Sequence, residues 1–345
     1  MTINSPERTA HSQPRSACSR GIRVVAGAVF LLVASIAGPS WAQLKPGQSD
    51  QFAGETCTLT LAPGVATTSK QAHWRLNTAN RTLTQGVSEL KPAKELQSSN
   101  AGGAAERSFV IKTPEVKSGV MLEVDLFLHF GDPLSETRHP LRLHSPDCFV
   151  NIRQTLRDAG IALYDPAGIT EDALKKTGLT PNVAASLKRV DSEAIIVIGE
   201  SIAWDKRTVK AAEQWASDGK WVIVLRPTDA STWPMQTSAA DGVKLAFTSI
   251  TNSRWRPKQL DLDFWSSHAE HARGWELQVS NNQLRMTPAI GPQVWQLAEY
   301  QSRENHGGCL FVGVPLISRW NESPVPRELL THILLQTLPH PQLDP

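Results

Sequence analysis

Two continuous apolar runs, separated by one segment of helical pattern, constrain the fold more than any other feature. Residues 194–198 (AIIVI) and 221–225 (WVIVL) are apolar throughout, which is typical of strands buried on both faces of a parallel sheet. Between them, Asp205 is placed to cap a helix and Gly219 to end it. A strand, a capped helix and a second strand form a βαβ unit, which predicts a right-handed crossover and a parallel sheet.

The residues around this unit extend the prediction to a three-layer α/β fold over 149–338. Apolar residues at helical spacing, short apolar runs and Pro or Gly signals mark the remaining elements. The expected helices are 152–159, 170–177, 181–188 and a last one that opens at Ser323-Pro324; the expected strands are 161–164, 294–298 and 310–314. Because helices alternate with strands, we expect them on both faces of one sheet. The tail, 339–345, is expected to be loose.

The preceding part of the chain, 43–148, has the pattern of an all-β domain. From Val120 to Phe130, apolar residues occupy every second position, so one face of this strand is expected to pack on a core and the other to be mostly wet. Shorter strands are expected at 56–61, 73–76 and 107–112. Several short strands with frequent turns predict an immunoglobulin-like β-sandwich.

The amino terminus has the order of a secretory signal peptide. Four arginines accompany an apolar run over 24–38, and Ser40-Trp41-Ala42 supplies small residues just before Gln43. The run is shorter than the ~20 residues that span a bilayer. We therefore expect 1–42 to be removed and the remaining protein to be periplasmic or secreted, without stable membrane insertion. An uncleaved anchor is the alternative.

The charge balance after residue 42 argues against two classes of partner. This part has 31 basic and 32 acidic residues, which gives no electrostatic reason to expect binding to nucleic acid or to an anionic membrane. No cofactor and no metal are expected. A homo-oligomer is compatible with the sequence.

Three cysteines follow residue 42. Cys57 lies in the first expected strand and Cys148 at the end of the sandwich. Export would permit a disulfide between them; separate buried thiols are the alternative. Cys309 begins an apolar strand and is expected to be a small core residue.

Three motifs in the second half carry a resemblance to a known family. They are 193–200 (EAIIVIGE), 219–227 (GKWVIVLRP) and 308–316 (GCLFVGVPL), the last followed by Trp320-Asn321-Glu322-Ser323-Pro324 and an amphipathic helix. Over about 151–338 the chain resembles class I glutamine amidotransferase-like domains with a flavodoxin-like fold, of the non-catalytic kind attached to bacterial β-galactosidases and related glycosidases. The sandwich resembles the immunoglobulin-like modules that precede such domains. The resemblance implies a role in carbohydrate metabolism.

The catalytic residues of that family are missing. Its chemistry needs a cysteine on a Gly-x-Cys-x-Gly elbow after a central strand and a His-x-Glu pair after a late strand. The matching turn here is Arg226-Pro227-Thr228-Asp229, and Val314-Pro315-Leu316 occupies the late position. We therefore expect no glutaminase activity.

Other polar residues follow the buried strands. Open α/β sheets bind ligands at the carboxyl ends of their strands, so Glu200, Ser201, Trp204 and Arg226 are candidate ligand-binding residues. Ser201 is a weak candidate nucleophile because Ala203 stands where a Gly-x-Ser-x-Gly elbow has its second glycine. A polar turn is the alternative.

Tryptophan is the unusual component of this composition. Of eleven tryptophans in the chain, nine follow Cys148. Indole faces can stack on sugar rings, and Trp204, Trp233, Trp265 and Trp320 are candidate ligand-binding residues in expected loops or strand ends, as is Trp255. The alternative is that tryptophans fill gaps between helices and sheet.

The leading interpretation is an exported, non-catalytic module with a carbohydrate-associated binding or assembly role, whose partner is a carbohydrate or a carbohydrate-active protein. One rival is a hydrolase of glycosides or esters that uses Glu200, Ser201 or the segment 261–271, where Asp261, Asp263, His268 and His271 cluster without a firm metal motif. The other rival is a structural protein that mediates oligomer contacts.

Overall fold

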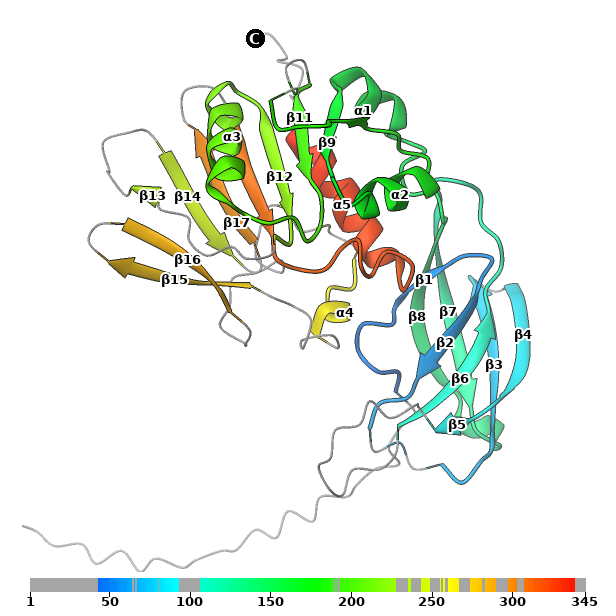
Figure 1. Ribbon diagram of the computed structural model, residues 1–345. Coiled ribbons are helices and arrows are strands. Elements are labelled where there is room, and N and C mark those ends of the chain that lie inside the picture. Colours follow the sequence, from blue (N-terminus) through cyan, green and yellow to red (C-terminus); the bar gives the residue numbers. More distant parts are fainter. Residues whose placement is uncertain are drawn as a thin grey trace, which may run out of the picture. The chain divides into compact units, whose positions relative to one another are not determined.

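A computed structural model describes most of the chain after residue 42. The described residues are 43–338 apart from 64, 66, 80, 93–105, 189, 191–192, 228–234, 237–242, 249–254, 256, 258–259, 267–273, 281–282, 290–296 and 303–306. They belong to one compact unit, Ser40–Pro345. They are mostly strand, with few helices, and form several sheets of which one is mixed (Figure 1). The division into two domains after residue 148 stays a prediction.

Two sheets make up the first part, the sandwich region. One sheet has the order β1-β8-β7-β3-β4 and the other β2-β6-β5. Their bounds are β1 Asp50–Phe52, β2 Thr56–Thr60, β3 Gln71–Thr78, β4 Arg81–Glu89, β5 Lys91–Pro92, β6 Arg107–Lys112, β7 Met121–His129 and β8 Thr137–His144, with a 3₁₀ turn, η1, at Pro133–Ser135. Only β1 and β8 pair in parallel among these strands.

The alternating pattern predicted for β7 is confirmed. Val124, Leu126 and Leu128 are buried and share one core with Leu59 of β2 and Phe109 of β6, which belong to the other sheet. Alternate residues of both sheets therefore meet in a single apolar layer. The strands predicted at 56–61, 73–76 and 107–112 are also present, whereas β1, β4, β5 and β8 were not predicted. Most of β4 is exposed, which explains why it lacks a clear apolar alternation.

The second part, the α/β region, is built on a mixed sheet with the order β10-β9-β11-β12-β18-β17-β14. The strands are β9 Ile161–Tyr164, β10 Asn182–Val183, β11 Ile195–Ile198, β12 Trp221–Leu225, β14 Val243–Thr248, β17 Leu297–Ser302 and β18 Gly308–Val312. β10, β9, β11, β12 and β18 pair with one another in parallel, while β17 pairs antiparallel with both β18 and β14. A further antiparallel sheet contains β13 Met235–Gln236, β16 Gln283–Ala289 and β15 Gly274–Ser280.

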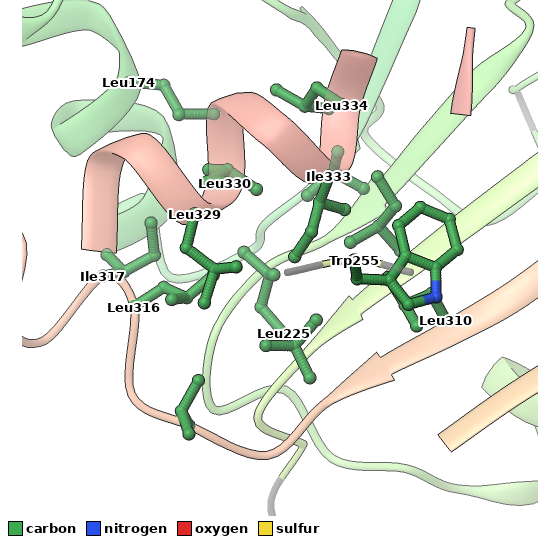
Figure 2. Packing of buried hydrophobic residues seen from close by; sticks show 14 of the residues in the cluster. Leu174, Leu225, Trp255, Leu310, Leu316, Ile317, Leu329, Leu330, Ile333 and Leu334 are labelled. Atoms are coloured by element: carbon green, nitrogen blue, oxygen red, sulfur yellow. The ribbon is translucent and has the colours of Figure 1, made fainter. Parts of the chain in front are cut away.

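Helices cover both faces of the mixed sheet. The core on one face includes side chains of α3, Lys206–Ser217. The core on the other face includes α1 Arg153–Ala159, α2 Ile169–Lys176, α5 Pro324–Thr337 and the short α4 Asp263–Ser266. Figure 2 shows Leu329 and Ile333 of α5 on the side of the helix that meets the sheet. The three layers and the βαβ unit predicted from the two apolar runs are present, because β11 and β12 are adjacent, parallel and joined through α3.

The predicted helix ends are confirmed at two places. Asp205 accepts hydrogen bonds from the backbone N–H groups of Arg207 and Thr208 at the start of α3. Ser323 accepts one from the N–H of Val325 at the start of α5. Both caps satisfy donors that a helix leaves unpaired at its first turn.

The helix predicted over 181–188 is wrong. Asn182 and Val183 form β10, and the N–H of Ala184 donates to the carbonyl of Leu163 at 2.8 Å. The Asn182 side chain donates to Glu193 at 3.0 Å. Pairing with the edge strand β9 thus takes up backbone groups that a helix would have used, and it overrides the Thr180-Pro181 start signal. Of the strand predicted at 294–298, residues 297 and 298 belong to β17, and 294–296 lie outside the described residues.

The possible Cys57–Cys148 disulfide is absent, and Cys57, Cys148 and Cys309 are free thiols. The two residues lie against different cores. Cys57 belongs to the core of the sandwich region, whereas Cys148 packs against the α5 side of the α/β region. Cys309 is buried in the α3-side core, as predicted.

Candidate functional site

Glu200 occupies the carboxyl end of the buried strand β11, as the sequence predicted, and its carboxylate is buried. The N–H of Ile317 donates to Glu200 Oε2 at 2.5 Å, and the Ser318 hydroxyl donates to Oε1 at 2.6 Å. The N–H of Ser318 lies 3.3 Å from both oxygens. Arg226 Nη1, from the turn after β12, is 3.8 Å from Oε1. We call Glu200, Ser201, Arg226 and the segment 316–318 the carboxyl edge.

The backbone of the carboxyl edge is tightly constrained. Ser201 has φ 68° and Arg226 has φ 33°, a left-handed region that non-glycine residues seldom adopt. The N–H of Ser201 donates to the carbonyl of Arg226 at 3.2 Å, and the N–H of Glu200 donates to Thr170 Oγ1 at 2.9 Å. A Cβ at Gly199 would stand 2.9 Å from Asp165 Oδ1. These bonds and strained residues fix the turn in one arrangement.

The groups at the carboxyl edge are engaged with their own chain. A buried carboxylate is costly unless donors surround it, and here two backbone N–H groups, a hydroxyl and a guanidinium do so. Glu200 thereby ties the segment 316–318 across the place where open α/β sheets bind ligands. Its local role is to hold this segment.

The predicted tryptophans are buried where the structure describes them. Trp204 is 4% exposed, Trp265 3% and Trp320 2%. Each packs against a phenyl ring, Trp204 edge-on to Phe311 with ring centroids 5.0 Å apart. Trp255 is also buried, near Leu310 in Figure 2. In this conformation they fill gaps around the sheet, so a ligand would need a loop rearrangement to stack on them. Trp233 lies outside the described residues.

Asp261, a candidate of the hydrolase interpretation, joins the two regions. Its Oδ2 accepts from the N–H of Ser49 at 3.1 Å, and its own N–H donates to Asp50 Oδ2 at 2.7 Å. Its Oδ1 accepts from the N–H of Asp263. His268 and His271 lie outside the described residues, and within the described part no group of three or more His, Cys, Asp or Glu side chains could hold a metal ion.

A cleft of about 600 Å³ lies where the sandwich region meets α5, and sequence reasoning missed it. We call it the junction cleft. Its walls come from the start of β7, the end of β8 with the segment that follows, the start of α1, and α5, together with Pro257 and Leu260. Clefts of this size between structural regions are common ligand sites, and mostly apolar walls with a few polar groups are their usual lining.

One stripe of α5 forms a wall of the junction cleft. Glu328, Thr331, His332 and Leu335 line it, at the i, i+3, i+4, i+7 spacing of a single helix face. The core-facing residues of α5 are fully buried, whereas Glu328, His332 and Leu335 are half-buried. Glu328 and His332, polar residues four positions apart beside the apolar face of α5, are the signal that could have located this wall from the sequence.

His144, the last residue of β8, lines the junction cleft and lies between two carboxylates. Its Nε2 is 2.6 Å from Asp50 Oδ1, and its Nδ1 is 3.5 Å from Glu328 Oε1. Burial disfavours the charged imidazole, but the interactions with the Asp50 and Glu328 carboxylates outweigh it and raise the pKa of His144 to about 9. Arg142 binds both oxygens of Asp50, at 2.8 and 2.9 Å. His144 is therefore an imidazolium at neutral pH.

Cys148 also lines the junction cleft, as a protonated thiol. Burial raises its pKa to about 12, while a hydrogen bond with Thr331 acts in the opposite direction. A thiolate is the reactive form of cysteine, so Cys148 is not poised as a nucleophile at neutral pH. It contributes an apolar surface to the cleft.

Arg327 connects the two walls. Its guanidinium donates to the carbonyls of Trp320 and Pro146, each at 2.8 Å, and to Asn321 Oδ1 at 2.9 Å. It also lies 4.3 Å from the centre of the Phe52 ring of β1. One buried side chain therefore binds the end of the sandwich region to the start of α5, which fixes the geometry of the junction cleft.

No protein-family model matches this sequence, and no curated protein matches it either. Among solved structures, a ThuA-like protein from Bacteroides uniformis ATCC 8492 is similar at 8% identity over 50% of this chain and 87% of that one, with a TM-score of 0.23. An ICAM-5 D1–D4 ectodomain fragment is similar at 9% identity over 79% of this chain and 54% of the fragment, with a TM-score of 0.17. Scores this low do not establish a shared fold.

None of the helices in the described part of the chain is both long and apolar enough to cross a membrane.

Proposed function

We propose that this chain is an exported, non-catalytic module with a carbohydrate-associated binding or assembly role. In this proposal it consists of an immunoglobulin-like sandwich followed by a degenerate, flavodoxin-like amidotransferase-type region. The strand order supports the second part: β10-β9-β11-β12-β18 reads 2-1-3-4-5 in chain order, the order of flavodoxin-like sheets. The carbohydrate association rests on the sequence resemblance.

The observation that carries the non-catalytic assignment is the engagement of Glu200. General acid–base catalysis needs a carboxyl group within reach of a substrate proton, but the Glu200 oxygens accept hydrogen bonds from Ile317 and Ser318. The elbow position, Arg226, keeps a strained backbone and carries a guanidinium in place of a nucleophile. Cys309 is fully buried, and its burial raises the pKa of its thiol, which argues against glutaminase chemistry through this residue.

A glycan array followed by product analysis tests this function. The protein beginning at Gln43 should bind carbohydrate ligands and leave them, as well as chromogenic glycosides and esters, unhydrolysed. The protein should release no ammonia from glutamine, and native Cys309 should resist alkylation until the protein is unfolded. Turnover that disappears in Ser201→Ala would establish the hydrolase instead.

Export has a separate test. Mass spectrometry of the protein from the native cell envelope should give a chain that begins at Gln43. Recovery of the chain from the cytosol with Met1 retained would refute export and leave the binding role standing.

A further inference from the structure

The charged side chains around the junction cleft compensate one another. His144 lies between Asp50 and Glu328, Arg142 binds Asp50, and Arg153 binds both oxygens of Asp147 at 2.7 and 2.8 Å. Among the described residues these are three cations facing three carboxylates. An ionic ligand would lose its hydration without meeting an uncompensated charge. The cleft is therefore suited to a neutral ligand.

The remaining lining combines an apolar surface with hydrogen-bonding groups. Val120 just before β7, Met121 at its start, Ile152 before α1 and Leu335 of α5 give apolar contacts. Glu328 retains 30% side-chain exposure, and its 3.5 Å separation from His144 is longer than a normal hydrogen bond. Its carboxylate can thus accept hydrogen bonds from a ligand. The Thr331 hydroxyl, which donates to the carbonyl of Arg327 at 2.8 Å, is placed as a further acceptor.

We propose that the junction cleft binds a neutral saccharide unit, with Glu328 accepting hydrogen bonds from its hydroxyl groups. A pyranose ring has an apolar C–H face and a rim of hydroxyl donors, which matches a lining that combines apolar side chains with a carboxylate. The cleft volume of about 600 Å³ is within the range of small-molecule sites. This inference rests on the proposed carbohydrate role and names the place where it would act.

The binding test uses defined probes. Glucose, galactose, mannose, xylose, N-acetylglucosamine and their disaccharides are titrated into the protein by calorimetry, with glucuronate and glucosamine as charged comparators. The wild-type protein should bind at least one neutral sugar more tightly than either charged one. Tight binding of a charged comparator alone would overturn the assignment of a neutral ligand.

Two variants locate the site. Val120 is 42% exposed at the cleft rim, so Val120→Trp should fill the opening without disturbing the core and abolish binding. Glu328→Gln should weaken it about tenfold, because a hydrogen bond to a charged acceptor is lost. Matched controls are Val110→Trp, at a strand residue with 40% exposure, and Glu171→Gln, at an ion-paired helix residue with 22% side-chain exposure. Both controls should bind as wild type.

The outcomes separate the two proposals. Sugar binding that survives in both Val120→Trp and Glu328→Gln overturns this site and leaves the carbohydrate role intact. Binding lost in these variants together with hydrolysis of the bound sugar supports the site and refutes the non-catalytic function. Absence of binding by the wild-type protein to every sugar refutes both.

Discussion

The carboxyl edge and the junction cleft both hold a glutamate, yet the two carboxylates have different surroundings. Glu200 is buried and accepts hydrogen bonds from Ile317 and Ser318 of its own chain. Glu328 is half-exposed, stands 3.5 Å from an imidazolium and lines a cleft of about 600 Å³. The Glu200 carboxylate holds the segment 316–318 in place, whereas the Glu328 carboxylate faces a cleft that a ligand can enter.

This difference shows that a position in the fold does not by itself identify a site. The carboxyl ends of the parallel strands are where open α/β sheets bind ligands, and the polar residues there attract attention in the sequence. What decides their role is whether their hydrogen-bonding capacity is already used. For the junction cleft, the sequence offers only the spacing of the residues that form the stripe on α5.

The largest expected effect is a pH dependence of the free energy of unfolding that arises from His144 in the junction cleft. The folded-state pKa of His144 is raised to about 9 from 6.5. Its contribution to the free energy of unfolding is therefore complete below pH 6.5 and is lost as the pH rises through 9, with an upper value of about 3 kcal/mol. Urea unfolding at pH 6 and pH 10 should show this loss, and His144→Gln should remove most of it. An identical loss in that variant would mean that His144 is not held as a cation.

Arg327→Ala should cost about 2–3 kcal/mol. It leaves the carbonyls of Trp320 and Pro146 without a buried donor and exposes the Phe52 ring. Chemical unfolding measures the change, with the exposed Arg81→Ala as control, which should change stability by less than about 0.5 kcal/mol. If Arg327→Ala lowers the free energy of unfolding no more than Arg81→Ala does, Arg327 does not fix the walls of the junction cleft.

Gly199→Ala should cost about 2 kcal/mol, because the new Cβ would stand 2.9 Å from Asp165 Oδ1 and 3.0 Å from Thr170 Oγ1. The same change at Gly131, where a Cβ meets no atom within 4 Å but φ is 86°, measures backbone strain without crowding. Thermal unfolding compares them. A smaller loss at Gly199 than at Gly131 would mean that the carboxyl edge is looser than its contacts indicate.

The smallest effect is expected from the cap of α3. Asp205→Ala removes the acceptor for the N–H groups of Arg207 and Thr208 and should cost about 1 kcal/mol. Asp205→Asn keeps the acceptor and should therefore retain most of the free energy of unfolding, which chemical unfolding measures. If both variants lose the same amount, the charge near the helix start matters more than the cap.

Regular elements could be predicted because their signals are local. Alternation marks β7, the two apolar runs mark β11 and β12, and Asp205 and Ser323 cap helices as expected. The edge strand β10 could not be predicted, because its pairing with Leu163 outweighs a local helix-start signal. The parallel pairing of β11 with β12 and the position of Glu200 after β11 followed from these local patterns.

The function of the site residues could not be predicted in the same way, because it depends on distant partners. Glu200 is bound by Ile317, which is 117 positions away. The junction cleft brings the start of β7 and the end of β8 to α5, segments that are about two hundred residues apart in the chain. A single sequence shows the spacing on α5 but not what lies opposite it.

The most direct measurement is a paired comparison of unfolding free energies for Glu200→Gln and Glu328→Gln. The amide in place of Glu200 puts a donor against the N–H groups of Ile317 and Ser318, so a loss of about 2–3 kcal/mol is expected. Glu328 keeps 30% side-chain exposure, and without its charge the buried His144 still has its closer partner Asp50 at 2.6 Å, so Glu328→Gln should lose only about 1 kcal/mol. Equal losses, or a larger loss for Glu328→Gln, would contradict the assignment of the carboxyl edge as scaffold and the junction cleft as binding site.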